Sequence, residues 1–386
     1  MRPLAGRGHG PSKQGSSSIA RGRPSRWVVL IFGLFCLFTG RPATAQEVDC
    51  GQPLDGWITV APEEVGLNHA LLATAGDRVS ESMPFLRSLI VVRHGCIAYE
   101  GYFGGADEAT PFNVFSVTKS VTGTLIGIAI EEGLIDSVYD PIGDYLPIDA
   151  GDRRAQITLG NLLKMLSGID WDESNARDIL GMLQGERDEV ATILGLPLAG
   201  RPGTIWNYST ADSHLLSAVL TAATGVSTDE YAHSRLFEPL GIDESEWQTD
   251  AQGIPFGGTQ LYLRARDMAR FGLLYLHDGQ WDGVQIVPPR WIDLLTTPQL
   301  ADPSVYEMSY AAHWWHVLLG EFPPMHAASG YGGQLIFVAP DLDMVIVTTA
   351  NGYVEPPDRY ISGAQEAAQR EAILHLVRTA ILPASQ

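Results

Sequence analysis

The chain has few cysteines and an excess of acidic over basic residues. It has 3 cysteines in 386 residues, too few for a small disulfide-rich scaffold or a cysteine-based metal cluster. Lys and Arg total 25 against 45 Asp and Glu, which gives a net charge of −20. So acidic a protein repels polyanions, and we expect neither nucleic acid nor anionic lipid as a partner.

Motifs of several enzyme classes are also missing. No Gly-x-Ser-x-Gly elbow occurs, which argues against an α/β-hydrolase. The segment His313-Trp-Trp-His316 lacks the His-Glu-x-x-His pattern of zinc peptidases, no other metal-like cluster stands out, and glycine-rich phosphate loops are absent. The sequence therefore predicts no cofactor and no bound metal.

The most apolar run lies in the first 45 residues and is short. Trp27 to Phe38 is about 12 residues long, fewer than the roughly 20 that cross a bilayer. A basic stretch precedes it and the small residues Ala43-Thr-Ala45 follow, a pattern typical of a secretory signal peptide over 1–45. We expect a periplasmic or secreted protein, with no membrane association after cleavage. Removal of this segment takes away seven basic and no acidic residues, so the net charge falls from −20 to −27.

Two cysteines stay in the chain after cleavage, because Cys36 leaves with the leader. Cys50 and Cys96 could form a disulfide in an oxidising compartment, or they could be two buried thiols. Neither has the neighbours of a catalytic or metal-binding cysteine.

Strand-like segments cluster at both ends of the chain, and the middle is mostly helical. The expected strands form two hairpins, over 85–92 with 97–103 and over 334–338 with 344–349. Helices are expected to begin near Ser116, Leu159, Ala211 and Ala265, and another to cover 363–381. Strands from both ends must pair to avoid exposed edges, which predicts a sheet domain (46–115 and 291–386) with an inserted, mainly helical domain (116–290).

The motif that indicates chemistry is Ser116-Val-Thr-Lys119, at the start of a long apolar helix. Positions three apart share a helix face, so the Lys119 amine lies beside the Ser116 hydroxyl. A serine becomes a good nucleophile when a base takes its proton, and burial can lower the pKa of a lysine enough for that role. The alternative is that Ser116 caps the helix and Lys119 is a solvated first-turn residue.

Two further segments carry a family resemblance. Asn207-Tyr-Ser-Thr210 resembles the Tyr-x-Asn element of serine β-lactamases and penicillin-binding proteins, and His326-Ala-Ala-Ser-Gly-Tyr331 resembles their Lys-Thr-Gly element. Together with Ser-x-x-Lys, a signature of such enzymes, the order and spacing agree with that superfamily over about 84–376. The chain looks most similar to the branch with AmpC-type β-lactamases, D-alanyl-D-alanine peptidases, β-lactamase-like esterases and 6-aminohexanoate-dimer hydrolase.

The resemblance implies a fold and a set of roles. The fold would be α+β and β-lactamase/transpeptidase-like, an antiparallel sheet flanked by helices with the helical part inserted. Ser116 would be the acylated nucleophile, and Lys119 would be its proton acceptor or an electrostatic partner. Tyr208 would shuttle the proton to the leaving group, either as a phenolate favoured by Lys119 or as a relay. The backbone N–H groups of Ser116 and Tyr331 would form the oxyanion hole, and Thr210, Ala328, Ser329 and Gly330 would border the substrate.

Two positions depart from the family pattern. Thr210 stands where asparagine is usual, and Ala328 replaces the lysine that helps to bind a substrate carboxylate. Loss of that cation removes a charge-assisted hydrogen bond, which argues against efficient β-lactam hydrolysis. His326 could replace part of the charge or be an ordinary strand-end residue. Trp314 and Trp315 could line the acyl pocket or pack in the core.

We therefore expect an exported serine hydrolase that acts on a small-molecule ester or amide, with a slight preference for esters. The enzyme alternatives are a D-aminoacyl peptidase or oligoamide hydrolase and a weak β-lactamase. The alternative from another class is a non-catalytic penicillin-binding-like module.

Overall fold

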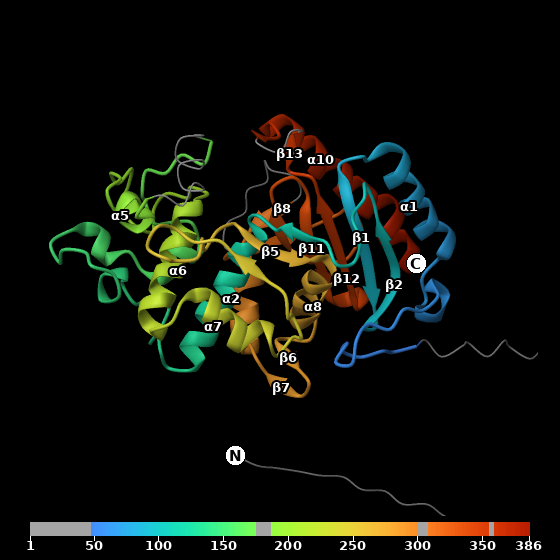
Figure 1. Cartoon of the computed structure of the whole chain (residues 1–386), viewed down its shortest axis with the longest axis horizontal. Helices are drawn as coiled ribbons and strands as arrows, with labels where there is room; N and C mark the ends of the chain where they lie inside the picture. The colour runs from blue at the N-terminus through green and yellow to red at the C-terminus, as the bar shows by residue number, and fades with distance from the viewer. Residues whose placement is uncertain (1–47, 175–186, 299–307, 355–358) are drawn as a thin grey trace, which may run out of the picture. The chain divides into compact units, whose positions relative to one another are not determined.

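A seven-stranded antiparallel sheet organises the chain (Figure 1). The computed structural model describes residues 48–174, 187–298, 308–354 and 359–386. The strand order in the sheet is β2-β1-β12-β11-β10-β9-β8. The strands are β1 (Leu86–Arg93), β2 (Cys96–Tyr102), β8 (Met308–Tyr310), β9 (Trp315–Val317), β10 (Met325–Gly330), β11 (Gln334–Ala339) and β12 (Met344–Ala350).

The two ends of the chain meet in this sheet, as the sequence predicts. β1 pairs with β12 in antiparallel register, with Leu89 opposite Thr348. The β1–β2 hairpin turns at His94 and Gly95, whose φ angles of 51° and 71° are those of a two-residue type I′ turn. Both predicted hairpins are confirmed.

Side chains of the sheet alternate between two cores. Leu89 and Val91 point into a core formed with α1 (His69–Ser82) and α10 (Gly363–Leu376). Their neighbours Ile90 and Val92 point into the second core, with α8 (Ala265–Leu276) and α2 (Val117–Glu131). Each fully buried aliphatic side chain contributes about 1.5–3 kcal/mol relative to exposure. The period of two along β1 therefore fixes its register.

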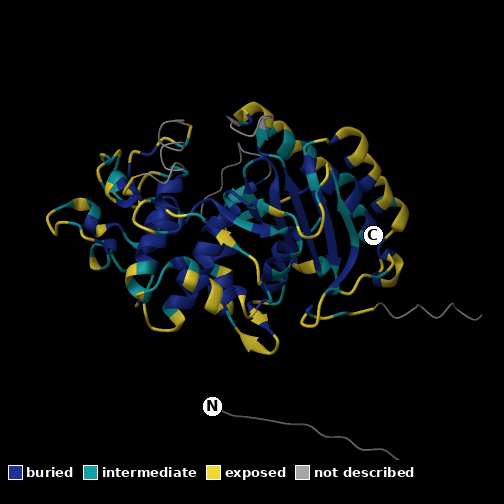
Figure 2. Cartoon of the chain, viewed as in Figure 1, coloured by how far each residue is buried: buried dark blue, intermediate teal, exposed yellow. Residues whose placement is uncertain are grey.

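The helical part surrounds α2, which is buried on all sides (Figure 2). Every residue of α2 from Val117 to Ala129 is buried, and α6 (Thr210–Thr224) packs against it. The other described helices are α3 (Leu159–Leu163), α5 (Glu189–Leu194), α7 (Thr228–Ala232) and α9 (Pro289–Thr296). The remaining strands form small sheets: β3 (Pro111–Asn113), β4 (Glu246–Trp247) and β5 (Leu261–Arg264); β6 (Gln280–Trp281) and β7 (Val284–Gln285); β13 (Tyr353–Val354) and β14 (Arg359–Tyr360).

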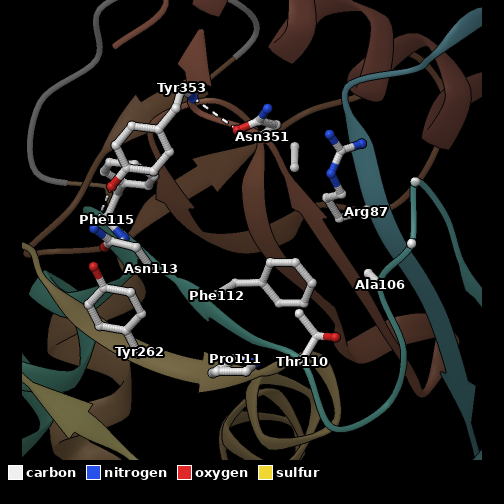
Figure 3. Close-up of a pocket in the computed structure, with 13 residues that line it drawn as sticks. Arg87, Ala106, Thr110, Pro111, Phe112, Asn113, Phe115, Tyr262, Asn351 and Tyr353 are labelled. Carbon is white, nitrogen blue, oxygen red and sulfur yellow. Dashed lines mark hydrogen bonds between the residues drawn. The ribbon is translucent and has the colours of Figure 1, made fainter. Parts of the chain in front are cut away.

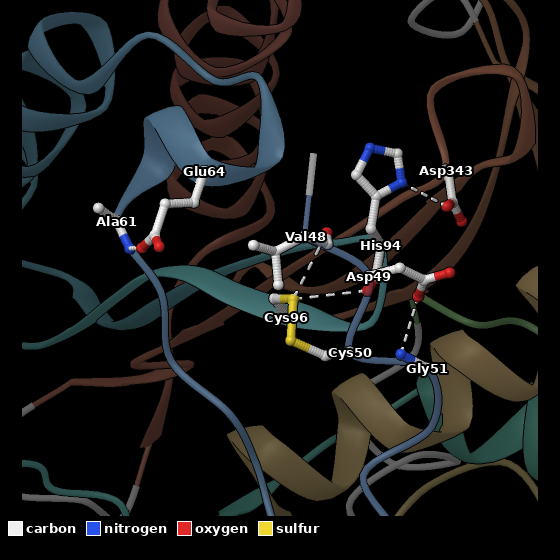
Figure 4. The surroundings of a disulfide bond; sticks show 9 residues. All are labelled: Val48, Asp49, Cys50, Gly51, Ala61, Glu64, His94, Cys96 and Asp343. Carbon is white, nitrogen blue, oxygen red and sulfur yellow. Dashed lines mark hydrogen bonds and ion pairs between the residues drawn. A yellow bond between two sulfur atoms is a disulfide. The ribbon is translucent and has the colours of Figure 1, made fainter. Parts of the chain in front are cut away.

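A disulfide joins Cys50 to Cys96 at the start of β2 (Figure 4). The sequence left open whether these cysteines form a bridge or stay as two free thiols, and the structure has the bridge.

Residues 45–386 form one compact unit, and the boundary between a sheet domain and a helical domain stays a prediction. Within the described ranges, no helix is both long and apolar enough to cross a membrane. The predicted signal peptide lies outside the described residues.

Candidate active site

Ser116 lies at the N-terminus of α2 and follows a strained residue. Phe115 has a φ of 47°, a left-handed conformation that side chains rarely adopt. Its N–H donates to Asn113 Oδ1 at 2.9 Å, and its ring packs against the rings of Tyr331 and Tyr353, with centroids 5.8 and 5.6 Å away. Ser116 occupies the N-cap position of α2, but its side chain makes no capping bond. The hydroxyl is therefore left for another use.

Lys119 is a buried amine with a complete set of acceptors. Its Nζ lies 3.0 Å from Ser116 Oγ, 3.0 Å from Thr210 Oγ1 and 2.8 Å from the carbonyl oxygen of Gly258. Only 2% of the residue is exposed, which contradicts the alternative of a solvated lysine. Burial lowers the pKa of Lys119 to about 8, against the opposing effect of Glu173 and Asp212. A substantial fraction of the amine is thus neutral in mildly alkaline solution.

Tyr208 joins this pair from the residue just before the cap of α6. Its half-buried ring has its centroid 5.0 Å from Lys119 Nζ. Burial, with Glu173 adding to it, raises the pKa of Tyr208 above its ordinary value, although a hydrogen bond with Ser116 opposes the rise. The phenol form is favoured, so of the two schemes expected from the sequence the structure supports a proton relay and not a standing phenolate.

The end of β10 lies against the start of α2. A Cβ placed on Gly330 would be 2.3 Å from the carbonyl oxygen of Val114 and 3.3 Å from the nitrogen of Ser116, so only glycine allows this approach. In the described part of the chain, neither the N–H of Ser116 nor that of Tyr331 has a hydrogen-bond acceptor. Tyr331 is itself held by its hydroxyl, which donates to the carbonyl oxygen of Ile361. These N–H groups stay available for an oxyanion.

The side chains expected to border the substrate lie at different depths. Thr210 is 3% exposed and its hydroxyl contacts Lys119, while Ala328 is fully buried in the core beside α2. Both side chains are thus buried, and a substrate contact by either stays a prediction. Ser329 is half-buried, and a substrate contact by Ser329 or Gly330 stays a prediction.

His326 does not replace the missing lysine. It sits opposite His316 across β10 and β9, with the ring centroids 6.0 Å apart. Burial, and to a smaller extent His316, lowers the pKa of His326 to about 4. The imidazole is therefore neutral at physiological pH and supplies no cation.

The two tryptophans have different positions. Trp314 is fully buried and its ring centroid lies 4.1 Å from that of Tyr275, so it belongs to the core. Trp315 is half-buried, and its ring centroid lies 6.3 Å from that of Tyr208. Trp315 thus lies near Tyr208, and a place for it in an acyl pocket stays a prediction.

Two groups at the site were missed by sequence reasoning. The carbonyl of Gly258 accepts from Lys119, and the carboxylate of Glu173 accepts from the Thr210 hydroxyl at 2.5 Å. The glycine pair Gly257-Gly258 is a sequence signal for a close backbone approach. Glu173 carries no such signal, because nothing local relates it to Thr210, 37 residues later.

Within the described ranges, no group of three or more His, Cys, Asp or Glu side chains could hold a metal ion. A pocket of about 340 Å³ is lined in part by residues 110–113 and Phe115, just before Ser116 in the sequence (Figure 3), and its volume is within the size range of small-molecule sites. Arg87, Phe112, Phe115, Tyr262 and Asn351 are among its lining residues. Ser116, Lys119 and Tyr208 do not line this pocket.

Comparisons with known proteins bear on the family and the fold. A family model described as Beta-lactamase matches residues 87–370. The 6-aminohexanoate-dimer hydrolase of Paenarthrobacter ureafaciens is 26% identical over 299 residues, covering 72% of this chain and 75% of that protein. The octameric penicillin-binding protein homologue from Pyrococcus abyssi aligns with a TM-score of 0.62 at 19% identity, over 81% of this chain and 78% of that one. EstCE1, titled a hydrolase with promiscuous acyltransferase activity, aligns with a TM-score of 0.64 at 18% identity, over 80% and 99%.

Proposed function

The chain belongs to the beta-lactamase family and is a serine hydrolase, and from this premise we propose that it cleaves a carboxylic ester or amide through an acyl-enzyme on Ser116. The observation that supports this most strongly is the buried Lys119 amine, 3.0 Å from a serine hydroxyl that does not cap its helix. An N-cap serine with a solvated lysine would show neither feature.

In the acylation step, Ser116 Oγ attacks the carbonyl carbon of the substrate and its proton passes to Lys119 Nζ. The carbonyl oxygen becomes an oxyanion between the N–H groups of Ser116 and Tyr331. Each such donor contributes about 3 to 4 kcal/mol to lowering the barrier, and the N-terminus of α2 favours the same negative charge. Collapse of the intermediate breaks the bond to the leaving group, which takes a proton through Tyr208.

Deacylation reverses these roles with water in place of the leaving group. Water adds to the acyl carbon while its proton passes through Tyr208 toward Lys119. The acid product then leaves, and the proton returns to Ser116 Oγ. Because the pKa of Tyr208 is raised, the phenol moves a proton in each step and is not ionised between steps.

The surroundings favour substrates with an apolar, uncharged acyl group. Three aromatic rings lie edge to face or tilted within 6.3 Å of each other, those of Tyr208, Tyr310 and Trp315. Strand β10 offers no cation to a substrate carboxylate, because it has Ala328 in place of lysine and His326 is neutral.

Ester cleavage is favoured because an ester needs less protonation of its leaving group than an amide. The second candidate is hydrolysis of a short oligoamide, supported by the similarity to a 6-aminohexanoate-dimer hydrolase. D-Aminoacyl peptidase and weak β-lactamase activities rank below these.

We also propose that the protein works outside the cytoplasm, in the periplasm or the medium. The leader-like pattern of residues 1–45 and the bridge between Cys50 and Cys96 support this location.

Labelling tests the nucleophile. A fluorophosphonate should modify the wild-type protein, and Ser116→Ala should reduce both labelling and ester turnover to background because the attacking oxygen is gone. Ser82→Ala, an exposed serine on α1, is the matched control and should label like the wild type. A wild-type protein that is folded yet unreactive would favour the non-catalytic binding module.

The same preparation ranks the substrates. We expect turnover of short p-nitrophenyl esters to exceed that of the 6-aminohexanoate dimer and of nitrocefin. Faster nitrocefin turnover would reverse the ranking and show that the missing cation on β10 is not needed for β-lactams.

A further inference from the structure

Glu173 is tied to the catalytic lysine through one threonine. One of its carboxylate oxygens accepts from Thr210 Oγ1 at 2.5 Å, and the other accepts from the N–H of Thr210 at 2.9 Å and from Trp171 Nε1 at 2.6 Å. Thr210 Oγ1 in turn accepts from Lys119 Nζ at 3.0 Å. Both Trp171 and Thr210 are buried and Glu173 is half-buried, so the contacts between Glu173, Thr210 and Lys119 lie mostly inside the protein.

The direction of the hydrogens along this chain is determined by chemistry. A carboxylate can only accept, so the single hydroxyl hydrogen of Thr210 points to Glu173. The lone pairs of the threonine oxygen then face Lys119, which must be the donor. Without the carboxylate, the hydroxyl could turn and donate its hydrogen to a neutral Lys119 amine instead.

This direction matters because Lys119 acts as a base only when it is neutral. A neutral amine has two hydrogens and one lone pair, and three groups surround Nζ here: Ser116 Oγ, Thr210 Oγ1 and the carbonyl oxygen of Gly258. The carbonyl can only accept, and Glu173 makes the threonine an acceptor. The two hydrogens are therefore taken, and the lone pair is left pointing at the Ser116 hydroxyl.

We propose that Glu173 is a positioning residue that, through the Thr210 hydroxyl, aims the lone pair of Lys119 at Ser116. The inference rests on the proposed function and deepens it. Glu173 plays the part toward a lysine that the third member of a Ser-His-Asp triad plays toward its histidine, where an acceptor fixes which nitrogen is free to take the proton.

The negative charge of Glu173 has a second, separable effect. It raises the pKa of Lys119 against the larger effect of burial. Removal of this charge should lower that pKa further, so the neutral amine would form at lower pH. Asp212 acts on Lys119 in the same direction and would remain.

The competing explanation is purely structural. Glu173 also fastens residues 171–173 to the N-terminus of α6, and Asn207 Nδ2 adds a bond to the carbonyl oxygen of Trp171 at 2.7 Å. A fastening role predicts lost stability when Glu173 changes, but not a loss confined to kcat, and the shifted pH profile that the lost charge causes would be common to both explanations.

The test compares Glu173→Gln with the wild type on a p-nitrophenyl ester across pH 6 to 10. The amide keeps the shape but no longer fixes the threonine hydrogen, so kcat should fall at least about tenfold, with KM changed less than about threefold. A general base raises the rate about 10²–10⁴-fold. The loss expected here is smaller, because Glu173→Gln keeps the base and changes only the direction of its lone pair. The acidic limb of kcat/KM should move to lower pH. Glu81→Gln on α1, an exposed glutamate, is the charge-matched control and should change neither.

Two threonine variants give an independent test and serve if Glu173→Gln does not fold. Thr210→Val removes the hydroxyl, and its kcat should fall as that of Glu173→Gln does. The acidic limb of its kcat/KM profile should move less, because the charge of Glu173 remains. Thr210→Ser restores the hydroxyl and should recover much of that kcat. Glu173→Gln combined with Thr210→Val should cost little more kcat than either change alone.

Three outcomes would overturn the inference. Glu173→Gln could keep both the wild-type kcat and the wild-type acidic limb of kcat/KM, or Thr210→Val and Thr210→Ser could have equal kcat. The third is a double variant whose loss of kcat equals the sum of the two single losses in free energy. Failure of the proposed function is distinguishable, because in that case the wild-type protein itself would not label with fluorophosphonate.

Discussion

Lys119 experiences two opposing influences, and their balance sets the working range of the site. Burial disfavours the ammonium form, while the carboxylates of Glu173 and Asp212 favour it, and the resulting pKa is about 8. A fully desolvated lysine without these carboxylates would have a lower pKa, and an exposed one would remain near its ordinary value above 10. The site therefore holds an amine that is close to half neutral near pH 8.

This balance predicts the pH dependence of the reaction. Only neutral Lys119 can take the Ser116 proton. The value of kcat/KM should therefore rise about tenfold per pH unit along an acidic limb that ends at a pH of about 8, and it should level off above that pH. The profile is measured with a p-nitrophenyl ester in buffers of constant ionic strength.

Substitution of the lysine checks the assignment of that limb. Lys119→Met fits the apolar surroundings but carries no base, so kcat should fall at least about 10²-fold and the limb should disappear. Lys164→Met, a change at a half-buried lysine with no place in the site, should keep the limb. A limb near pH 8 that persists in Lys119→Met would assign it to another group.

At the scale of elements, the active site depends on how closely β10 approaches the N-terminus of α2. Gly330 fills the point of contact, since a Cβ there would lie 2.3 Å from the Val114 carbonyl oxygen. Gly330→Ala should push the strand and the Tyr331 N–H away from the oxyanion position. We expect kcat to fall about 10²–10³-fold, the cost of losing one oxyanion donor.

A matched glycine separates this effect from a general loss of fold. Gly151→Ala adds the same methyl group where no atom lies within 4 Å, so kcat should not change. Circular dichroism should show Gly330→Ala folded at the assay temperature. Near-wild-type turnover in a folded Gly330→Ala protein would contradict the oxyanion role of Tyr331.

The elements that the sequence predicts well are those with local signals. The hairpin at His94-Gly95 and the apolar α2 follow from turn chemistry and from burial on all sides, and Ser116 and Lys119 lie one turn apart, so one helix places both. Tyr208 came only from the family resemblance. Glu173 could not be foreseen, because its partner Thr210 lies on another element and no repeat relates them. The strands β3, β4 and β5 have two to four residues each, too short for alternation to be recognised.

For the whole molecule, the site requires segments from most of the chain at once. The N-termini of α2 and α6 bring Ser116 and Tyr208 together, and the end of β10 adds the Tyr331 N–H. The strands β11, β12 and β1 follow β10 in the sheet and hold it in place. Both helix N-termini carry partial positive charge. The molecule thus brings two helix N-termini to one point in an acidic chain of net charge −20.

The bridge between Cys50 and Cys96 links compartment to stability at the same scale. It closes a loop of 46 residues, and in the chain-entropy model a loop of this length contributes about 4 kcal/mol to the free energy of unfolding. Neither cysteine contacts Ser116, Lys119 or Tyr208, so the bridge should support the fold and not the chemistry.

We therefore expect protein recovered from the periplasm or medium to begin near Gln46, to carry the bridge and to contain no free thiol among its mature residues. The double variant Cys50→Ser/Cys96→Ser should lose up to about 4 kcal/mol in urea unfolding, while kcat on the ester stays at the wild-type value in the folded baseline. Dithiothreitol should destabilise the wild-type protein by a similar amount and leave the double variant unaffected, because only the wild type has a bond to reduce. Mass spectrometry that finds an intact leader and two free thiols on cytoplasmic protein would contradict the proposed export, since the bridge would then have no oxidising compartment in which to form.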